Sequence, residues 1–159
     1  MDPTPLFAFG HGLSYTSFAY SDLVIEQREI GTDGTALISC TVRNTGARAG
    51  AEVVQLYLSD PVAQVVRPAR WLAGFARVPL KPGQAGRVTF RLHADRTAFT
   101  GRDPSTGTRA VEPGEIGVAV GGASDRLPLQ GSFLMCGPER VVGPDRVLDT
   151  PAEVRLRAQ

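Results

Sequence analysis

The side chains of this sequence that could perform acid–base chemistry are carboxylates at the ends of hydrophobic runs. They are Glu52, Asp60, Asp95, Asp103, Glu112 and Glu115. Two carboxyl groups can share catalytic work only where their surroundings separate their pKa values, usually through an apolar pocket. The sequence predicts no such pocket, and each of these residues neighbours a turn or a strand end, where solvated carboxylates are common. We therefore expect no catalytic residue in this chain.

Histidine and cysteine offer no second kind of site. His11 and His93 lack the partners of a Ser-His-Asp triad, and with the distant Cys40 and Cys136 they cannot supply the three or four ligands of a metal site. Cys40 lies in a strand pattern, which favours a buried free thiol over a disulfide and leaves the compartment undetermined. We expect no metal and no cofactor.

The elements that carry these side chains are predicted to be short strands. Apolar and polar residues alternate in most of the runs, and 18 glycines and 12 prolines mark the turns between them. The expected strands cover residues 17–25, 36–42, 53–59, 71–78, 87–92, 116–120 and 127–135, with a short extended piece at 98–99. This pattern predicts an all-β, immunoglobulin-like or fibronectin type III-like sandwich of about seven to eight antiparallel strands.

Two of these strands have particular features. Apolar residues occur on both faces of the run 53–59, which indicates a central strand. The run 71–78 is interrupted by Gly74, which predicts a bulge at that point.

The chain is predicted to have three parts: a joining segment over residues 1–16, the β-sandwich over 17–136, and a loosely ordered tail over 137–159. In the tail, Thr150-Pro151-Ala152-Glu153 fits a capping box with proline at the first helical position. Because few residues follow, we expect at most a short helix there.

Composition limits the partners. The net charge is +1, which gives no electrostatic case for nucleic acid or an anionic membrane. No run approaches the ~18 apolar residues of a transmembrane helix. The first residues lack the basic and apolar regions of a signal peptide. We expect a soluble protein whose compartment the sequence leaves unknown.

The first 20 residues are unusually aromatic. They hold five of the 11 aromatic residues, namely Phe7, Phe9, Tyr15, Phe18 and Tyr20. An irregular segment of this kind would be an exposed apolar patch unless a surface covers it. We expect it to pack against its own domain or a neighbouring one.

Four pieces of the sequence, in order, resemble one family. They are PLFAFGHGLSYTSFAYSDL (5–23), VRNTGARAGAEVVQLYLSDP (42–61), VVRPARWLAGFARVPLKPGQAGRVTF (65–90) and VEPGEIGVAVGGAS (111–124). Together they resemble the C-terminal fibronectin type III-like domain of family 3 glycoside hydrolases, the β-glucosidase and β-xylosidase group. The resemblance runs from about Pro5 to Phe133.

The resemblance implies a function without catalysis in this chain. Enzymes of this family, which hydrolyse O-glycosyl bonds in carbohydrate metabolism, place a catalytic barrel first and an α/β sandwich second. Their nucleophile is a barrel aspartate in a Ser-Asp-Trp context, and their acid/base is usually a glutamate of the second domain. Ser59-Asp60-Pro61 is only superficially similar and matches the accessory domain's own motif. The chain would then be a separated or truncated module.

We therefore expect a non-catalytic accessory domain that docks on and stabilises the barrel and α/β domains. The residues expected at the interdomain interface are Phe7, Phe9, His11, Leu13, Tyr15, Arg67 and Arg70. The alternative is an independent carbohydrate-binding or adhesion module, for which Trp71 is the candidate that would stack on a polysaccharide.

Overall fold

The computed structural model of the protein describes residues 5–62, 68–100 and 107–157, which form twelve strands and one short 3₁₀ helix. The elements are β1 (Phe18–Ile25), β2 (Glu29–Gly31), β3 (Thr35–Asn44), β4 (Gly50–Ser59), β5 (Trp71–Leu80), β6 (Ala85–His93), η1 (Ala94–Thr97), β7 (Phe99–Thr100), β8 (Arg109–Val111), β9 (Gly114–Gly121), β10 (Leu129–Cys136), β11 (Arg140–Val142) and β12 (Ala152–Leu156). No helix in this part of the chain is long and apolar enough to cross a membrane.

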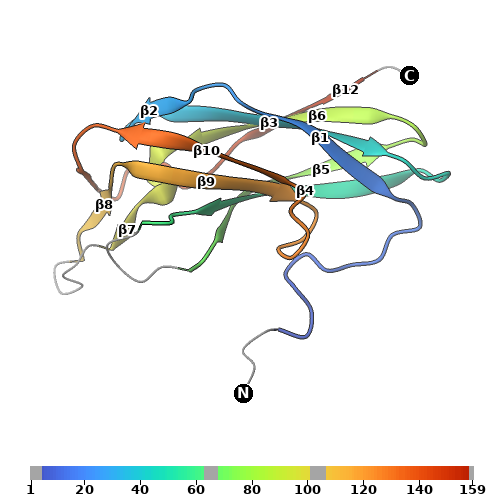
Figure 1. Ribbon diagram of the computed structural model, residues 1–159, viewed down its shortest axis with the longest axis horizontal. Helices are drawn as coiled ribbons and strands as arrows, with labels where there is room; N and C mark the ends of the chain where they lie inside the picture. Colours follow the sequence, from blue (N-terminus) through green and yellow to red (C-terminus); the bar gives the residue numbers. More distant parts are fainter. Residues whose placement is uncertain (1–4, 63–67, 101–106, 158–159) are drawn as a thin grey trace.

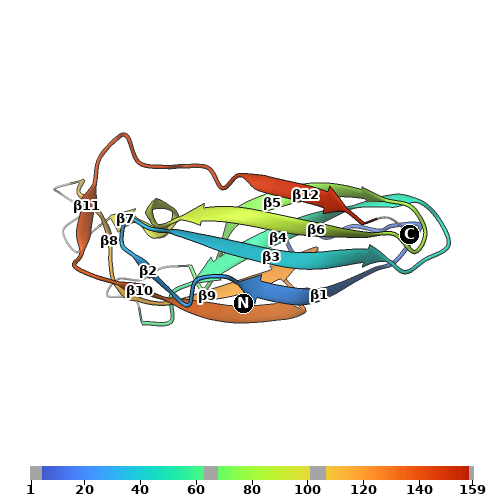
Figure 2. The same ribbon diagram turned by 90° about the horizontal axis from the view of Figure 1, so that it is seen from above.

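Two sheets lie face to face and form a sandwich (Figure 1). One sheet has the order β1-β3-β6-β12 and the other has the order β2-β10-β9-β4-β5. A small third sheet, β11-β8-β7, lies at one end (Figure 2). The predicted all-β sandwich is confirmed, with twelve strands in place of seven to eight. Among the described residues, every strand pair is antiparallel except β2 with β10, which is parallel.

The core lies between the two sheets. It forms because buried apolar side chains alternate with outward-facing side chains along the central strands. In β6, Val88, Phe90 and Leu92 are almost completely buried, whereas Arg91 between them is exposed. Cys40 of β3 is a fully buried free thiol, as predicted, and burial raises its pKa to about 12. A thiol with so high a pKa stays protonated and unreactive at neutral pH.

The predicted irregularity in β5 is present. The pairing of β4 with β5 shifts register between Leu56 and Tyr57, because Leu56 pairs with Gly74 and Tyr57 pairs with Leu72. A Cβ atom on Gly74 would lie 3.3 Å from the Phe90 ring and 3.1 Å from Thr150. Glycine thus lets the edge strand approach both the core ring and the segment that leads to β12.

The C-terminal residues form strands, so the helix expected at Thr150–Glu153 is wrong. Residues 152–156 form β12, which pairs antiparallel with β6 from Ala152↔Phe90 to Leu156↔Gly86. The backbone N–H of Arg91 also donates to the carbonyl of Pro151 at 2.9 Å. Pro151 therefore begins a strand rather than a helix, because an open sheet edge offers backbone partners that a frayed helix lacks.

A buried ion pair attaches the segment between β10 and β12 to the sandwich. Asp95 of η1 is 7 % exposed and accepts from the guanidinium of Arg140 and from the backbone N–H of Val147 at 2.8 Å. Arg140 also donates twice to the carbonyl of Thr32, at 2.9 and 2.7 Å. Burial alone would raise the pKa of Asp95, but these hydrogen bonds outweigh burial and hold it below its usual value.

Candidate functional site

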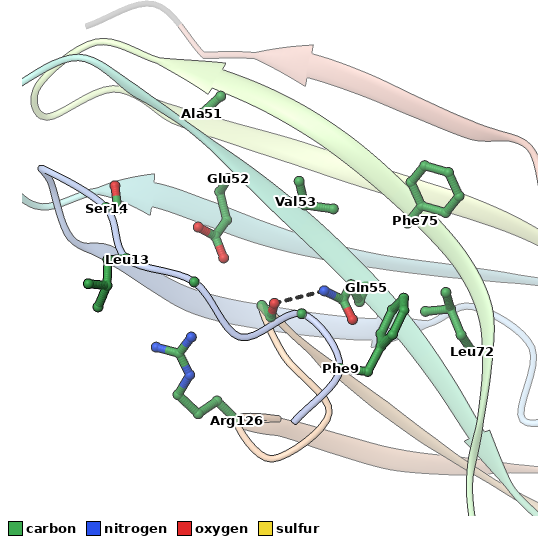
Figure 3. A pocket seen from close by; sticks show the side chains of 13 residues that line it. Phe9, Leu13, Ser14, Ala51, Glu52, Val53, Gln55, Leu72, Phe75 and Arg126 are labelled. Carbon is green, nitrogen blue, oxygen red and sulfur yellow. Dashed lines mark hydrogen bonds between the residues drawn. The ribbon is translucent and has the colours of Figure 1, made fainter. Parts of the chain in front are cut away.

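The N-terminal strap, residues 5–16, runs beside β4 and the loop after β9 (Figure 3). It is held there by its backbone: the N–H of Ser124 donates to the carbonyl of Phe9 at 2.8 Å. Gly10 has a φ of 84°, and a Cβ atom on it would lie 2.9 Å from the carbonyl oxygen of Gly122. Glycine is required here by both the left-handed backbone and the close approach.

Polar side chains under the strap are satisfied within the domain. Tyr57 donates from its hydroxyl to Oε1 of Gln55 at 2.6 Å, and Nε2 of Gln55 donates to the carbonyl of Gly122 at 2.8 Å. Both side chains are almost fully buried on the outer face of β4. Because buried amides and hydroxyls are costly without partners, this chain of bonds fixes the surface on which the strap rests.

At its C-terminal end the strap is tied to the sandwich by Asn44, which is completely buried. Thr16 donates to Oδ1 of Asn44 at 2.6 Å, and Nδ2 of Asn44 donates to the carbonyls of Arg48 at 2.7 Å and Leu80 at 3.1 Å. The strap therefore has fixed anchors near Phe9 and at Thr16, with the segment between them spanning a hollow.

That hollow is a groove of about 510 Å³ between the strap and the five-stranded sheet (Figure 3). It is lined by Phe9, Gly10, Gly12, Leu13, Ser14, Ala51, Glu52, Val53, Gln55, Leu72, Phe75, Gly122 and Arg126. The side chains of Glu52 and Arg126 lie on two sides of it. A second hollow of about 650 Å³ shares Gly12, Leu13 and Ser14 with the first.

Glu52 is one of the two ionisable residues that line the groove. Its Oε1 accepts from the Tyr20 hydroxyl at 2.7 Å. Burial, followed by this hydrogen bond to a carboxylate, raises the pKa of Tyr20 well above its usual value, so the phenol remains a donor. The pair ties β1 to β4 and leaves the groove with one carboxylate, one guanidinium and mostly apolar walls.

The predicted interface residues of the strap expose much apolar surface. Leu13 is 99 % exposed and Tyr15 is 90 % exposed, and Phe7 and Phe9 are both exposed over more than half of their surface. The rings of His11 and Phe7 lie 4.8 Å apart. The guanidinium of Arg48 lies 5.9 Å from the ring of Tyr15. The three aromatic residues of the strap therefore remain exposed in this chain, whereas Phe18 and Tyr20 of β1 pack partly against the core.

Arg70 and Arg67 are the two arginines predicted for the same interface. Arg70 donates to the carbonyl of Ser124 at 3.2 Å, and Ser124 is the residue whose N–H binds Phe9, so Arg70 lies beside the strap anchor. Arg67 lies outside the described residues.

Sequence reasoning missed the wall of the groove opposite the strap. Leu72 and Phe75 of β5 and Val53 of β4 line it, and Phe75 is 63 % exposed. The available signal was the presence of apolar residues on both faces of β4, which indicates that its outer face is covered as well as its inner face.

The carboxylates named from the sequence do not converge on one site. Oδ1 of Asp60 accepts from the N–H of Val62 at 3.2 Å, the turn role expected of it, and Glu115 accepts from Ser132 at 2.7 Å. Asp95 is buried and ion-paired, so its interpretation as a solvated turn residue is wrong. Asp103 lies outside the described residues. Within the described ranges, no group of three or more His, Cys, Asp and Glu side chains could hold a metal ion.

Trp71, the candidate for sugar stacking, opens β5 and packs partly against the core. Its indole N–H donates to the carbonyl of Arg96 at 3.3 Å. Tyr57, which could have extended an aromatic platform, is buried. The aromatic rings exposed on this domain are those of the strap and Phe75 instead.

Comparison with known proteins identifies the domain. Residues 52–124 match the fibronectin type III-like domain family. The chain is 42 % identical over 123 residues to a β-xylosidase of Formosa agariphila, covering 77 % of this chain and 17 % of the relative. It is 41 % identical over 128 residues to the thermostable β-glucosidase B of Acetivibrio thermocellus, covering 80 % of this chain and 17 % of the relative.

Solved structures agree with the sequence comparison. A β-glucosidase from Erythrobacter marinus matches with a TM-score of 0.78 at 40 % identity, covering 86 % of this chain and 18 % of that one. The β-glucosidase 3B of Thermotoga neapolitana matches with a TM-score of 0.77 at 34 % identity, covering 89 % and 19 %. The chain thus spans less than a fifth of the length of these relatives. It belongs to the fibronectin type III-like domains of the family 3 glycoside hydrolases, the β-glucosidase and β-xylosidase group.

Proposed function

We propose that this chain is the non-catalytic accessory domain of a family 3 β-glycosidase and that the strap face docks on the enzyme's catalytic domains and stabilises them. The observation that carries this proposal is the uncovered apolar surface of the strap, where Leu13 and Tyr15 are almost fully exposed although the strap itself is firmly anchored. An anchored apolar surface of this kind marks an interaction site.

The proposed partner follows from the relatives, which are several times longer than this chain and carry a matching domain. Their names describe β-glucosidases and β-xylosidases. We propose the hydrolysis of a β-linked glucoside or xyloside as the activity of the enzyme that this domain serves. The groove beside the strap would receive an apolar side chain from the catalytic part, with Glu52 and Arg126 available for polar contacts at its sides.

The docking role can be tested in a chimera. The matching domain of the Thermotoga neapolitana enzyme would be replaced by this chain, with or without Leu13→Asp and Tyr15→Asp. The double substitution is expected to lower the thermal midpoint of the chimera, because burying a leucine side chain contributes ~1.5–3 kcal/mol that a carboxylate forfeits. The same substitutions should change the free energy of unfolding of the isolated chain by only about 0.5 kcal/mol, since both side chains are exposed there.

The matched control is Val141→Asp in β11, where valine is 65 % exposed at the other end of the sandwich. It should leave the midpoint of the chimera unchanged. A chimera whose midpoint is insensitive to the strap substitutions, or equally sensitive to the control, would contradict docking through the strap.

The isolated chain is expected to show no turnover of aryl β-glucosides or aryl β-xylosides. Three of the carboxylates that could perform acid–base chemistry are engaged separately: Asp95 with Arg140, Glu52 with Tyr20 and Glu115 with Ser132. The measurement is release of the aryl group at high protein concentration. Turnover in the range typical of enzymes, ~1–10³ s⁻¹, would show that the domain itself is catalytic.

Independent carbohydrate binding is the alternative function. It has less support at Trp71, whose ring is partly packed and whose N–H is already bonded. Calorimetry against cello-oligosaccharides and insoluble glucans separates the two functions, because saturable binding that is lost in Trp71→Ala would favour a binding module.

A further inference from the structure

The outer face of the four-stranded sheet, on the side of the sandwich away from the strap, carries an arrangement that the docking proposal does not use. On β6, Arg87, Thr89 and Arg91 alternate with the buried core residues and therefore point outward. On β3, Ser39 and Thr41 share that face. We call this surface the arginine face.

The arginine face is in register across three strands. One row consists of Ser39, Thr89 and Glu153, and the next consists of Thr41, Arg87 and Arg155. Two arginines, Arg87 and Arg155, are thus directly opposite each other on neighbouring antiparallel strands. Like charges in this position destabilise a strand pair unless a counter-charge lies close by.

The counter-charges within the domain are incomplete. Arg155 donates from Nε to Glu153 at 2.7 Å, but both side chains are largely exposed. Arg87 donates to the hydroxyl of Ser39 at 2.5 Å, which neutralises no charge. Asp22 of β1 is close enough to Arg87 to feel its charge, although its carboxylate already accepts a hydrogen bond from the Ser21 hydroxyl. Arg87, Arg91 and Arg155 face only two lining carboxylates, Glu26 and Glu153, so one guanidinium charge remains in excess.

A groove of about 450 Å³ lies over these residues. Its walls include Arg87, Arg91 and Arg155, the hydroxyls of Ser39 and Thr89, and the carboxylates of Glu26 and Glu153. The groove therefore combines groups that bind carboxylates with groups that exchange hydrogen bonds with hydroxyls. Guanidinium groups form bidentate hydrogen bonds with carboxylates, which adds geometric selectivity to charge attraction.

We propose that the arginine face binds a polysaccharide that carries spaced carboxylates, that is, a chain containing uronic acids. The arginines would pair with the carboxylates, and Glu26, Glu153 and Thr89 would bond the intervening hydroxyls. The acidic residues within the groove oppose a continuous polyphosphate, so charge complementarity favours this ligand over nucleic acid.

This surface is independent of the docking role. The strap rests on the five-stranded sheet beside β4, whereas β3, β6 and β12 belong to the other sheet. The two functions could therefore operate together, and failure of either leaves the other standing.

The test is calorimetric titration of the full chain with oligogalacturonates, compared with neutral xylo-oligosaccharides of equal length. Saturable binding of the acidic oligosaccharides alone is expected, weakening as salt concentration rises. The variant carrying Arg91→Glu and Arg155→Glu should bind at least about tenfold more weakly, which corresponds to about 1.4 kcal/mol. Both side chains are exposed, so the fold should be retained, and circular dichroism checks this.

The matched control is Arg77→Glu, an exposed arginine of β5 in the other sheet, which should bind like the unmodified chain. Four results would overturn the proposal. One is equal affinity for neutral oligosaccharides, and another is the absence of saturable binding. The third is equal binding of polyglutamate or DNA, and the fourth is equal weakening by Arg77→Glu, because either would reveal only general attraction between charges.

Discussion

Replacing Asp95 with alanine is expected to lower the free energy of unfolding by about 3 kcal/mol, toward the lower end of the range for breaking a buried ion pair. The loss is large because Arg140 would keep its charge without its carboxylate, and the N–H of Val147 would lose its acceptor. The Arg140 side chain is 31 % exposed, so water relieves part of this cost. Urea unfolding of the two proteins at neutral pH measures the difference.

The same substitution should also change how the free energy of unfolding depends on pH in acid solution. The hydrogen bonds from Arg140 and Val147 hold the pKa of Asp95 below its usual value of 3.8 in the folded chain. A group with a depressed folded pKa contributes stability above its unfolded pKa and loses that contribution as pH falls through the folded pKa. In the unmodified protein, the stabilisation from ionised Asp95 should therefore be lost as the pH falls below about 3.8. The free energy of unfolding of Asp95→Ala should lack this part of the decrease with falling pH.

A suitable control is Asp149→Ala, an exposed aspartate in the segment that Asp95 holds in place. It should shift the free energy of unfolding by no more than about 0.5 kcal/mol. Two results would show that the buried ion pair does not attach the C-terminal segment. One is an equal loss of free energy of unfolding in the two variants. The other is the same dependence of that free energy on acid pH with and without Asp95.

Replacing Phe90 with alanine is expected to cost about 3–5 kcal/mol, a large share of the roughly 5–15 kcal/mol that stabilise a typical domain. Phe90 is completely buried, and its ring lies against Gly74, where the edge strand comes closest to the core. Removing the ring leaves a cavity, because the two packed sheets cannot move together far enough to close it. The fall in thermal midpoint and in denaturant midpoint measures the effect.

Phe75→Ala in β5, a strand of the other sheet, provides the matched comparison. Phe75 is 63 % exposed, so the same loss of a phenyl ring should cost far less than at Phe90. Similar losses at the two positions would mean that Phe75 is covered in the isolated chain. In the chimera, by contrast, Phe75→Ala should become more costly if the groove receives a side chain of the catalytic part.

The long strands could be predicted from the sequence because their own residues decide them. Residues 87–92 alternate perfectly and lie in β6, and residues 36–42 lie in β3. Gly74 indicated the irregularity of β5 for the same local reason. The short strands β2, β8, β11 and β12 left no such pattern, because each exists through hydrogen bonds to a partner far away in the chain.

The site was predictable in part. Aromatic crowding drew attention to the strap, where Leu13 and Tyr15 are exposed, and the interdomain interface expected there stays a prediction. The opposite wall of the groove depends on the register of β4 with β5, which no local pattern specifies. The burial of Asp95 was missed because its partner, Arg140, lies in a segment that the sequence presented as a loose tail.

The attachment of β12 to β6 has a consequence for how the domain is made. Most strand neighbours in this sandwich are distant in sequence, and domains of such high contact order fold in milliseconds to seconds rather than microseconds. During synthesis the edge of β6 must remain unpaired until residues 152–156 leave the ribosome. A chain truncated before Ala152 would keep that edge open and would be prone to pair with another nascent chain.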